Sequence, residues 1–179
     1  MRELLSRGAN IEAAINGGAT SLYVASQCGN TDVVRELLAR GANVEAAKNN
    51  GATSLLIASA EGHLNVVCEL LTRGATVEAT PPGGWTSMLI ASQKGRLDVV
   101  RELLARGANI EAADNDGATP LIFASFFGRV DVVRALLAAG ANKHHVDDSG
   151  DTAVSCAGES FRASPDSTAA ILALLAAAP

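Results

Sequence analysis

Apolar and polar positions follow a helical period over two short runs between residues 51 and 83. The first run places a small, mostly apolar face at Leu55, Ala58 and Ser59. The second places apolar residues at Leu64, Val67, Leu70 and Leu71, which are i, i+3, i+6 and i+7. Such spacings are typical of helices that bury one face. The pattern predicts two short helices in succession, each with one packed side.

Local signals mark where these two helices begin and end. Thr53-Ser54 offers a hydroxyl to the free N–H groups at the start of the first helix, and Gly62 can end it in a left-handed conformation. Gly74 ends the second helix. Residues 75–83 carry turn formers and a short alternation at Val77, which predicts an extended, hairpin-like loop.

The helix, turn, helix and loop recur every 33 residues. Fourteen of the seventeen glycines fall on three ladders with this step, and pairs of leucines keep the same step. The ladders are Gly8, Gly41, Gly74, Gly107 and Gly140; Gly18, Gly51, Gly84, Gly117 and Gly150; and Gly29, Gly62, Gly95 and Gly128. One unit of this size cannot bury its own apolar face, so successive units must stack into a solenoid.

Several blocks of these units match a known family. Residues 20–25 (TSLYVA), 53–58 (TSLLIA) and 119–124 (TPLIFA) resemble the T-P-L-H-x-A signature of ankyrin repeats. Residues 62–67 (GHLNVV) and 107–112 (GANIEA) are similar to the G-H-x-x-V-V and G-A-D-V-N-A segments of that family. The resemblance covers essentially the whole chain, because motif and period agree across successive units.

The resemblance implies an all-α ankyrin-repeat solenoid, in which stacked helix-turn-helix units carry hairpin-like loops. Inner helices and loops would line a concave face, and outer helices would form the convex back. We expect one ankyrin-repeat domain over residues 1–179. Its units would be a partial repeat (1–17), full repeats (18–50, 51–83, 84–116 and 117–149) and a divergent C-terminal cap repeat (150–179).

The chain departs from the family pattern at two recurring positions. The signature histidine is replaced by Tyr23, Leu56, Leu89, Ile122 and Ser155. We expect aliphatic packing in place of the hydrogen bonding between repeats that the resemblance assigns to that imidazole. Glutamates stand where the family usually has asparagine, so we expect none of the modifications that the family carries there. These glutamates are Glu12, Glu45, Glu78 and Glu111.

Both ends of the array are irregular. The chain opens inside a second helix at Arg2-Glu3-Leu4-Leu5, so we expect either a piece of a longer array, which we favour, or a reduced cap. In the last unit, about five residues are inserted around residues 159–166. Residues 164–167 (SPDS) then predict a turn and a cap before a final helix. Residues 169–178 are apolar throughout and lack the polar outer face of a cap.

Composition and charge exclude several classes of protein. With 48% apolar residues the chain is not disordered, and a net charge of −5 argues against a general nucleic-acid binder. Three widely spaced cysteines without a C-x-x-C motif are typical of reduced, intracellular proteins. Neither a signal peptide nor an apolar run of about 20 residues is visible. We therefore expect an intracellular, cytoplasmic protein that binds neither nucleic acid nor membranes.

Motifs for catalysis and cofactor binding are missing from the sequence. It contains no phosphate-binding glycine loop, no H-E-x-x-H and no G-x-S-x-G, so we expect neither an enzyme nor a cofactor. His144-His145 with Asp147 and Asp148 are a compact set of metal-ligand types. The alternative is that these residues form the polar hairpin tip of their unit, and we expect no metal.

The aromatic residues gather in one part of the array. Trp85, Phe123, Phe126 and Phe127 are four of the six aromatic residues and fall in two adjacent units, at positions that the resemblance assigns to the concave face. Aromatic residues that face solvent are typical of interface anchors, although these rings could also fill the gap between stacked repeats. The candidate partner-binding residues are Asn49, Asn50, Ile57, Trp85, Ile90, Lys94, Asp116, Phe123, Phe126 and Phe127.

We therefore expect a protein-interaction module, or scaffold, that binds a protein partner through the concave face. The partner would present an apolar or aromatic segment, and the acidic tips around it favour a basic neighbour. These tips carry Asp114, Asp116, Asp147 and Asp148. The alternatives are weak self-association of an otherwise monomeric chain through its ends, and a metal or small-molecule site near His144-His145.

Overall fold

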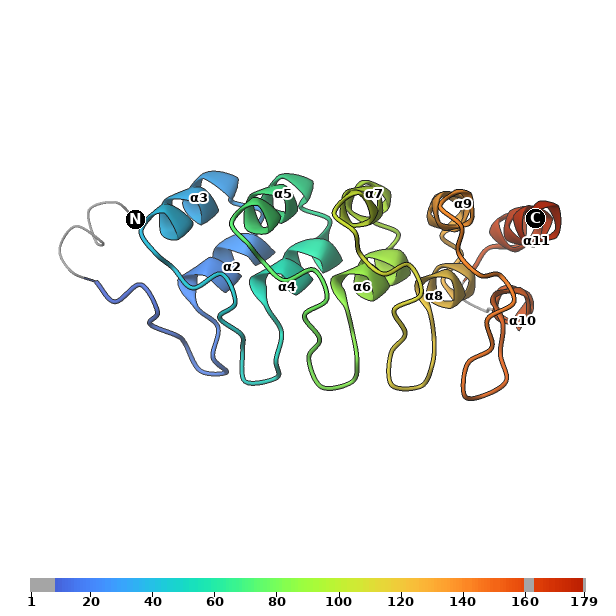
Figure 1. The fold of residues 1–179 in the computed structure, drawn as a ribbon, viewed down its shortest axis with the longest axis horizontal. Coiled ribbons are helices and arrows are strands. Elements are labelled where there is room, and N and C mark those ends of the chain that lie inside the picture. The colour runs from blue at the N-terminus through green and yellow to red at the C-terminus, as the bar shows by residue number, and fades with distance from the viewer. Residues whose placement is uncertain (1–8, 160–162, 179) are drawn as a thin grey trace.

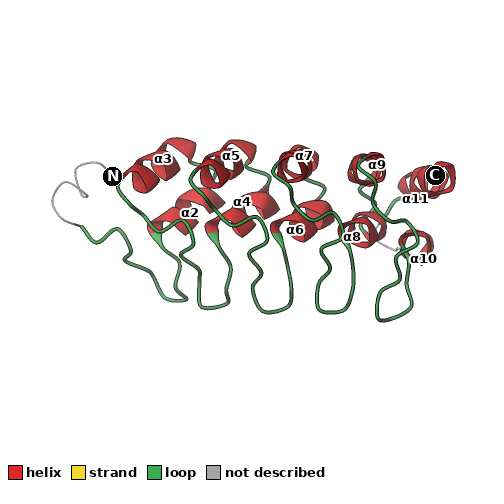
Figure 2. Ribbon diagram, viewed as in Figure 1, coloured by secondary structure: helices red, strands yellow, loops and turns green. Residues whose placement is uncertain are grey.

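Two rows of antiparallel helices and a row of loops build the molecule, as Figures 1 and 2 show. The computed structural model describes residues 9–159 and 163–178. The inner helices, from which the loops extend, are α2 (Ser21–Gln27), α4 (Ser54–Glu61), α6 (Ser87–Lys94), α8 (Pro120–Phe126) and α10 (Ala153–Glu159). The outer helices are α3 (Thr31–Ala39), α5 (Leu64–Thr72), α7 (Leu97–Ala105), α9 (Val130–Ala138) and α11 (Pro165–Ala177). Each inner helix packs on its own outer helix and on the next inner helix.

Each of the first four inner helices begins at a threonine cap. The side chains of Thr20, Thr53, Thr86 and Thr119 accept a hydrogen bond from the backbone N–H three residues later. For Thr86 and Leu89 the distance is 3.2 Å. Gly62 ends α4 with φ 85° and ψ 24°, a left-handed conformation that glycine adopts without strain. The predicted start and end of this helix are confirmed.

The core lies between the two rows of helices and runs along the whole described stack. The first leucine of each pair is fully buried in the outer helices, at Leu37, Leu70, Leu103 and Leu136. Burying one such side chain stabilises the fold by about 1.5–3 kcal/mol. Because one continuous apolar cluster joins the buried residues of successive units, the units depend on one another for their stability.

The residues that replace the signature histidine pack as expected in most units. Leu89 and Ile122 are buried, Tyr23 is buried, and Leu56 is half-buried against a small cluster that contains Tyr23. The expectation of aliphatic packing is wrong at Ser155. Its hydroxyl donates a 3.0 Å hydrogen bond to Asp151, because the last inner helix begins with a network of polar side chains.

The last helix begins as the sequence predicts. Ser164 caps α11 and accepts a 3.1 Å hydrogen bond from the N–H of Ser167. Ile171 and Leu175 bury one side of the helix, whereas Leu172 is 37% exposed on the other. The predicted opening helix at residues 2–5 lies outside the described residues. So do residues 160–162, which belong to the predicted insertion.

Candidate functional site

Two aromatic rings from adjacent units lie against each other on the side of the stack that carries the loops. Trp85 precedes α6 and Phe123 lies in α8; their ring centroids are 4.7 Å apart and the planes are inclined by 47°. Both side chains are half-buried. Phe123 also packs on the core, so it is part of the repeat interface as well as of the surface. Such an aromatic pair stabilises by about 0.5–1.5 kcal/mol beyond the area that it buries.

Trp85 occupies a position that is small in the units around it. The equivalent residues, at steps of 33, are Ala19, Ala52 and Ala118, and all three are buried. The space that holds an alanine methyl cannot hold an indole, and the ring of Trp85 extends to Phe123 of the next unit. Trp85 therefore links the third unit to the fourth through an aromatic contact.

Phe126 and Phe127 form a second aromatic pair where α8 ends. Their centroids are 5.1 Å apart in an edge-to-face arrangement, and both side chains are half-buried. At the end of the preceding inner helix lies Lys94, an exposed cation. The two aromatic pairs and this cation therefore belong to the inner helices and loops of two adjacent units.

The loop tips that end the third and fourth units lie side by side, and the first of them is bonded to the chain just before Trp85. The N–H of Asn115 donates to the carbonyl of Gly83 at 3.3 Å, and the N–H of Asp148 donates to the carbonyl of Asp116 at 3.0 Å. The side chains of Asp116 and Asp148 are exposed. Two exposed carboxylates therefore stand on neighbouring loop tips, which are joined to each other by a backbone hydrogen bond, and the tip of Asp116 is bonded to the residue two places before Trp85.

Other aspartates of these tips stabilise their own turns. Asp114 accepts hydrogen bonds from the N–H groups of Asp116 and Ala118, and Asp147 does the same for Ser149 and Asp151. This geometry is the Asx turn, which fixes a loop locally. Asp114 and Asp147 are thus bound to the backbone by one of their oxygens.

The remaining predicted residues lie in the neighbouring units. Ile57 and Ile90 are half-buried on α4 and α6, in the same helix position as Phe123. Asn49 donates its N–H to the carbonyl of Gly17 at 3.0 Å, and Asn50 accepts a hydrogen bond from Ala52. The two asparagines shape the second loop and are one unit away from Trp85.

Two series of hydrogen bonds between units were missed by sequence reasoning. Glu12, Glu45, Glu78 and Glu111 each accept from a backbone N–H of the next loop, at 2.8, 2.6, 2.9 and 2.7 Å. In the second series, the side chains of His63, Arg96 and Arg129 bind backbone carbonyls of the preceding unit, at 3.0, 3.0 and 2.9 Å. The 33-residue recurrence of glutamate was the available signal, because a solvated glutamate has no reason to keep this spacing.

The loop that carries His144-His145 is held by a contact within its own unit and by hydrogen bonds to α11. Nε2 of His145 lies 2.9 Å from the carbonyl of Gly117, and the ammonium of Lys143 donates to the carbonyls of Leu175 and Ala178 at the end of α11. Within residues 9–159 and 163–178, no three His, Cys, Asp or Glu side chains gather in a way that could hold a metal. No observation therefore favours the metal site that the sequence left open.

Burial changes the acidity of two side chains. Burial, with a smaller effect of Glu61, raises the pKa of the Tyr23 hydroxyl, whose ring also lies 5.2 Å from the ammonium of Lys48. Burial and then the carboxylate of Glu102 raise the pKa of the Cys68 thiol. Since the thiolate is the nucleophile, this shift disfavours reactivity at Cys68.

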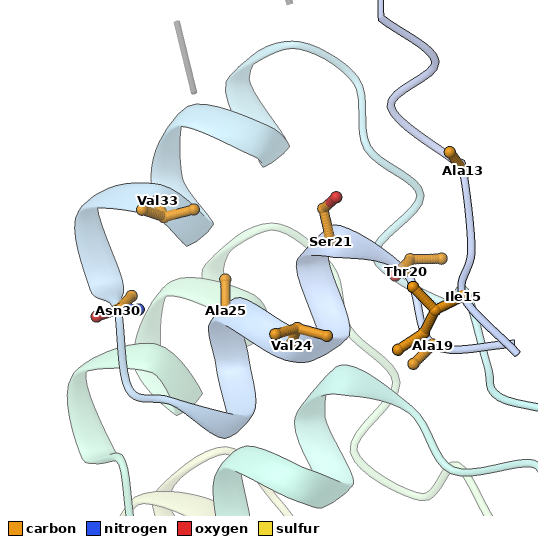
Figure 3. Close-up of a pocket in the computed structure, with 9 residues that line it drawn as sticks. All are labelled: Ala13, Ile15, Ala19, Thr20, Ser21, Val24, Ala25, Asn30 and Val33. Carbon is orange, nitrogen blue, oxygen red and sulfur yellow. The ribbon is translucent and has the colours of Figure 1, made fainter. Parts of the chain in front are cut away.

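A hollow lies at the N-terminal end of the described stack (Figure 3). Ile15, Val24 and Val33 contribute apolar side chains to it, and Val24 is 40% exposed. Val33 is half-buried, whereas the equivalent Val66 of the next unit is fully buried. The hollow is thus the face on which a preceding unit packs elsewhere in the stack.

None of the helices that the structure describes has the length and apolar character of a membrane span.

Comparison with known proteins agrees with this repeat architecture. A search of curated proteins finds no match to the chain. A family model described as ankyrin repeats (3 copies) matches residues 1–81 and again residues 78–147. With its stacked helix pairs and projecting loops, the chain belongs to the ankyrin repeat family.

Proposed function

We propose that this ankyrin domain is a non-enzymatic interaction module that binds a protein partner through the loops and inner helices of its third and fourth units. The observation that carries the proposal is the Trp85–Phe123 pair, in which Trp85 stands where the neighbouring units have a buried alanine. Half-buried aromatic side chains are frequent anchors of interfaces, because they bury a large area at a low cost in conformational entropy. Ankyrin repeats in general bind proteins, which supports the proposal.

A display experiment tests this function without knowledge of the natural partner. A random peptide library is selected against the intact chain, and the enriched peptides are titrated against the Trp85→Ala/Phe127→Ala variant. We expect at least a tenfold loss of affinity for that variant. The matched control is Arg101→Ala/Arg134→Ala, which removes two exposed side chains from the outer helices α7 and α9. Its affinity should stay within a factor of two of the unmodified chain.

Circular dichroism and urea unfolding must first show that both variants fold. If the aromatic variant folds and binds the selected peptides with unchanged affinity, the proposed surface is wrong. The same holds if the outer-helix control loses more affinity than the aromatic variant.

Self-association is a second candidate function, and the ends of the stack support it. The large apolar side chains that are exposed among the described residues lie near the two ends of the stack, within residues 15–24 and 146–172. They are Ile15, Val24, Val146, Val154 and Leu172. Light scattering on the unmodified chain and on Val24→Asp/Leu172→Asp tests this candidate. A mass that is monomeric at all concentrations for both proteins would exclude it.

We also propose that the chain acts inside the cell. Its three cysteines, Cys28, Cys68 and Cys156, form no disulfide with one another, and reduced thiols are normal in the cytosol. Alkylation in freshly lysed cells, followed by mass spectrometry, tests the location. Three reduced thiols are expected, and a mixed disulfide at any of them would contradict it.

A further inference from the structure

An apolar side chain lies at the same inner-helix position in each of the first four units. Val24, Ile57, Ile90 and Phe123 follow one another at steps of 33 residues on α2, α4, α6 and α8. Val24 is exposed and the other three are half-buried. We call these four residues the apolar row. Because consecutive inner helices are in direct contact, neighbouring members of the row are about 8–10 Å apart.

This spacing selects the backbone conformation of a partner that follows the row. In the polyproline II conformation the chain advances about 3.1 Å per residue with three residues per turn, so every third side chain falls on one face and about 9 Å further on. In a β-strand, side chains on one face recur about every 7 Å, which does not match the row. A helix reaches about 10 Å only at seventh residues, which would leave most of its apolar face uncovered.

The negative charge near the Phe123 end of the row favours a positive charge at the corresponding end of the partner. Asp116 and Asp148 are exposed on neighbouring loop tips, and the tip of Asp116 is bonded to Gly83, two residues before Trp85. Lys143, the lysine of the loop that carries Asp148, donates to a carbonyl at the end of α11 and so leaves that carboxylate to a partner. A cation from a partner would be attracted by the carboxylates of both tips, which are acceptors that ammonium and guanidinium groups prefer.

We infer that the partner of this domain is an extended, polyproline II-type segment that carries apolar side chains at every third position and a lysine or arginine beyond the last of them. The apolar side chains lie on the apolar row, and the cation lies at Asp116 and Asp148. The inference rests on the proposed function, because it specifies the ligand of the same surface.

Synthetic peptides test this inference. The probe is a fluorescein-labelled peptide of sequence (Leu-Pro-Ser)₃-Arg-Arg, and its binding is followed by anisotropy. One comparison peptide replaces both arginines by glutamate, and another keeps the composition but places the leucines next to one another. A third carries leucine at every seventh position of an alanine-rich helix. Since Trp85 is the only tryptophan, its emission reports whether a bound peptide lies at the aromatic pair.

We expect the probe to bind at least tenfold more tightly than each comparison peptide, to change the emission of Trp85, and to lose affinity as salt is added. Asp116→Asn/Asp148→Asn should weaken the probe at least fivefold. Asp98→Asn/Asp131→Asn, which removes two exposed carboxylates of the outer helices, should leave it unchanged. Equal binding of the glutamate peptide, or no effect of the tip variant, overturns the role of the carboxylates. Equal or tighter binding of the shuffled or helical peptide overturns the inference that the ligand is an extended, polyproline II-type segment.

The display selection described under the proposed function distinguishes a failure of the interaction surface from a failure of the extended, cation-bearing ligand. If the selected peptides need Trp85 but share neither the period of three nor a terminal cation, this inference is wrong and the interaction surface stands. If no selected peptide depends on Trp85 and the probe does not bind, both are wrong.

Discussion

The carboxylate of Glu45 accepts a hydrogen bond of 2.6 Å from the backbone N–H of Thr76, which lies in the loop of the next unit. The same bond recurs along the array. The N–H groups of Asn43, Asn109 and Asn142 donate to the carboxylates of Glu12, Glu78 and Glu111, respectively. At the next step the position is His144, and the neighbouring Lys143 donates to carbonyls of α11. The glutamates therefore join successive loops, and the series stops at the unit that packs on α11.

Glu78→Ala should lower the stability of the array. The substitution leaves the N–H of Asn109 without its carboxylate acceptor, and for an exposed, charge-assisted hydrogen bond the loss is about 1 kcal/mol. Urea unfolding followed by circular dichroism measures it. Glu78→Gln, which keeps an acceptor oxygen, should lose less than half as much. Glu61→Gln is the control, since Glu61 is exposed at the end of α4 and outside this series. A stability equal to that of the unmodified chain in Glu78→Ala would refute the role of the carboxylate.

Ser92→Ala should raise stability. The hydroxyl of Ser92 is fully buried and has no hydrogen-bond partner among the described residues, as is also true of the equivalent Ser59. A buried hydroxyl without a partner costs about 1–3 kcal/mol, so we expect a gain of about 1 kcal/mol on its removal.

Thr72→Ala serves as the control for helix propensity in this experiment, because Thr72 is exposed in α5. If Ser92→Ala gains no more stability than Thr72→Ala, the hydroxyl has a partner in solution, such as a bound water, and the prediction fails.

Ala135→Glu should create an ion pair between two outer helices. Arg35 lies 3.4 Å from Glu69 of the next unit, and at the corresponding place Arg101 meets Ala135 instead of a carboxylate. The introduced glutamate should stabilise the array by about 0.2–1 kcal/mol, the range for exposed ion pairs. A double-mutant cycle with Arg101→Ala isolates the pair. A coupling of zero would show that Arg101 does not reach residue 135.

Tyr23→Phe should change how stability depends on pH in alkaline solution. Burial raises the pKa of Tyr23 above its ordinary value of 10.0, and the carboxylate of Glu61 adds to this, while the ammonium of Lys48 faces the ring. A raised folded-state pKa gives a stability that is present below pH 10 and is lost as the pH rises through that pKa. The variant should therefore lose less stability than the unmodified chain above pH 10.

Because Tyr23 is the only tyrosine, absorbance at 295 nm follows its ionisation directly. The folded chain should titrate above the urea-unfolded chain. Coinciding midpoints in the two states would contradict the predicted shift.

Much of the architecture could be predicted from the sequence because its signals are local. Thr53 caps α4 and Gly62 ends it, and both positions follow from side-chain and backbone chemistry within one turn of helix. The period of 33 residues then predicted the stack, since a single unit cannot bury Leu70 by itself. The motif match to ankyrin repeats over residues 1–147 confirms this part of the prediction.

The candidate site could be predicted only as a set of residues. Trp85 and Phe123 were both named, but their contact depends on where two units meet, and sequence distance does not give that. Asn49 and Asn50 were named beside them, yet their hydrogen bonds serve the second loop. The role of Glu45 was missed for the same reason, because its acceptor function appears only when the next loop is in place.

The sequence by itself determined the repeat, the two helices of each unit and the residues that face the core, because capping, helical period and burial act within one unit or between identical ones. Tertiary structure alone decided which side chains of different units meet. It joined Trp85 to Phe123, placed the tips of Asp116 and Asp148 side by side, and turned a recurring glutamate into a series of bonds between loops. Such contacts depend on the spacing and rotation of stacked units, which packing sets and local chemistry does not.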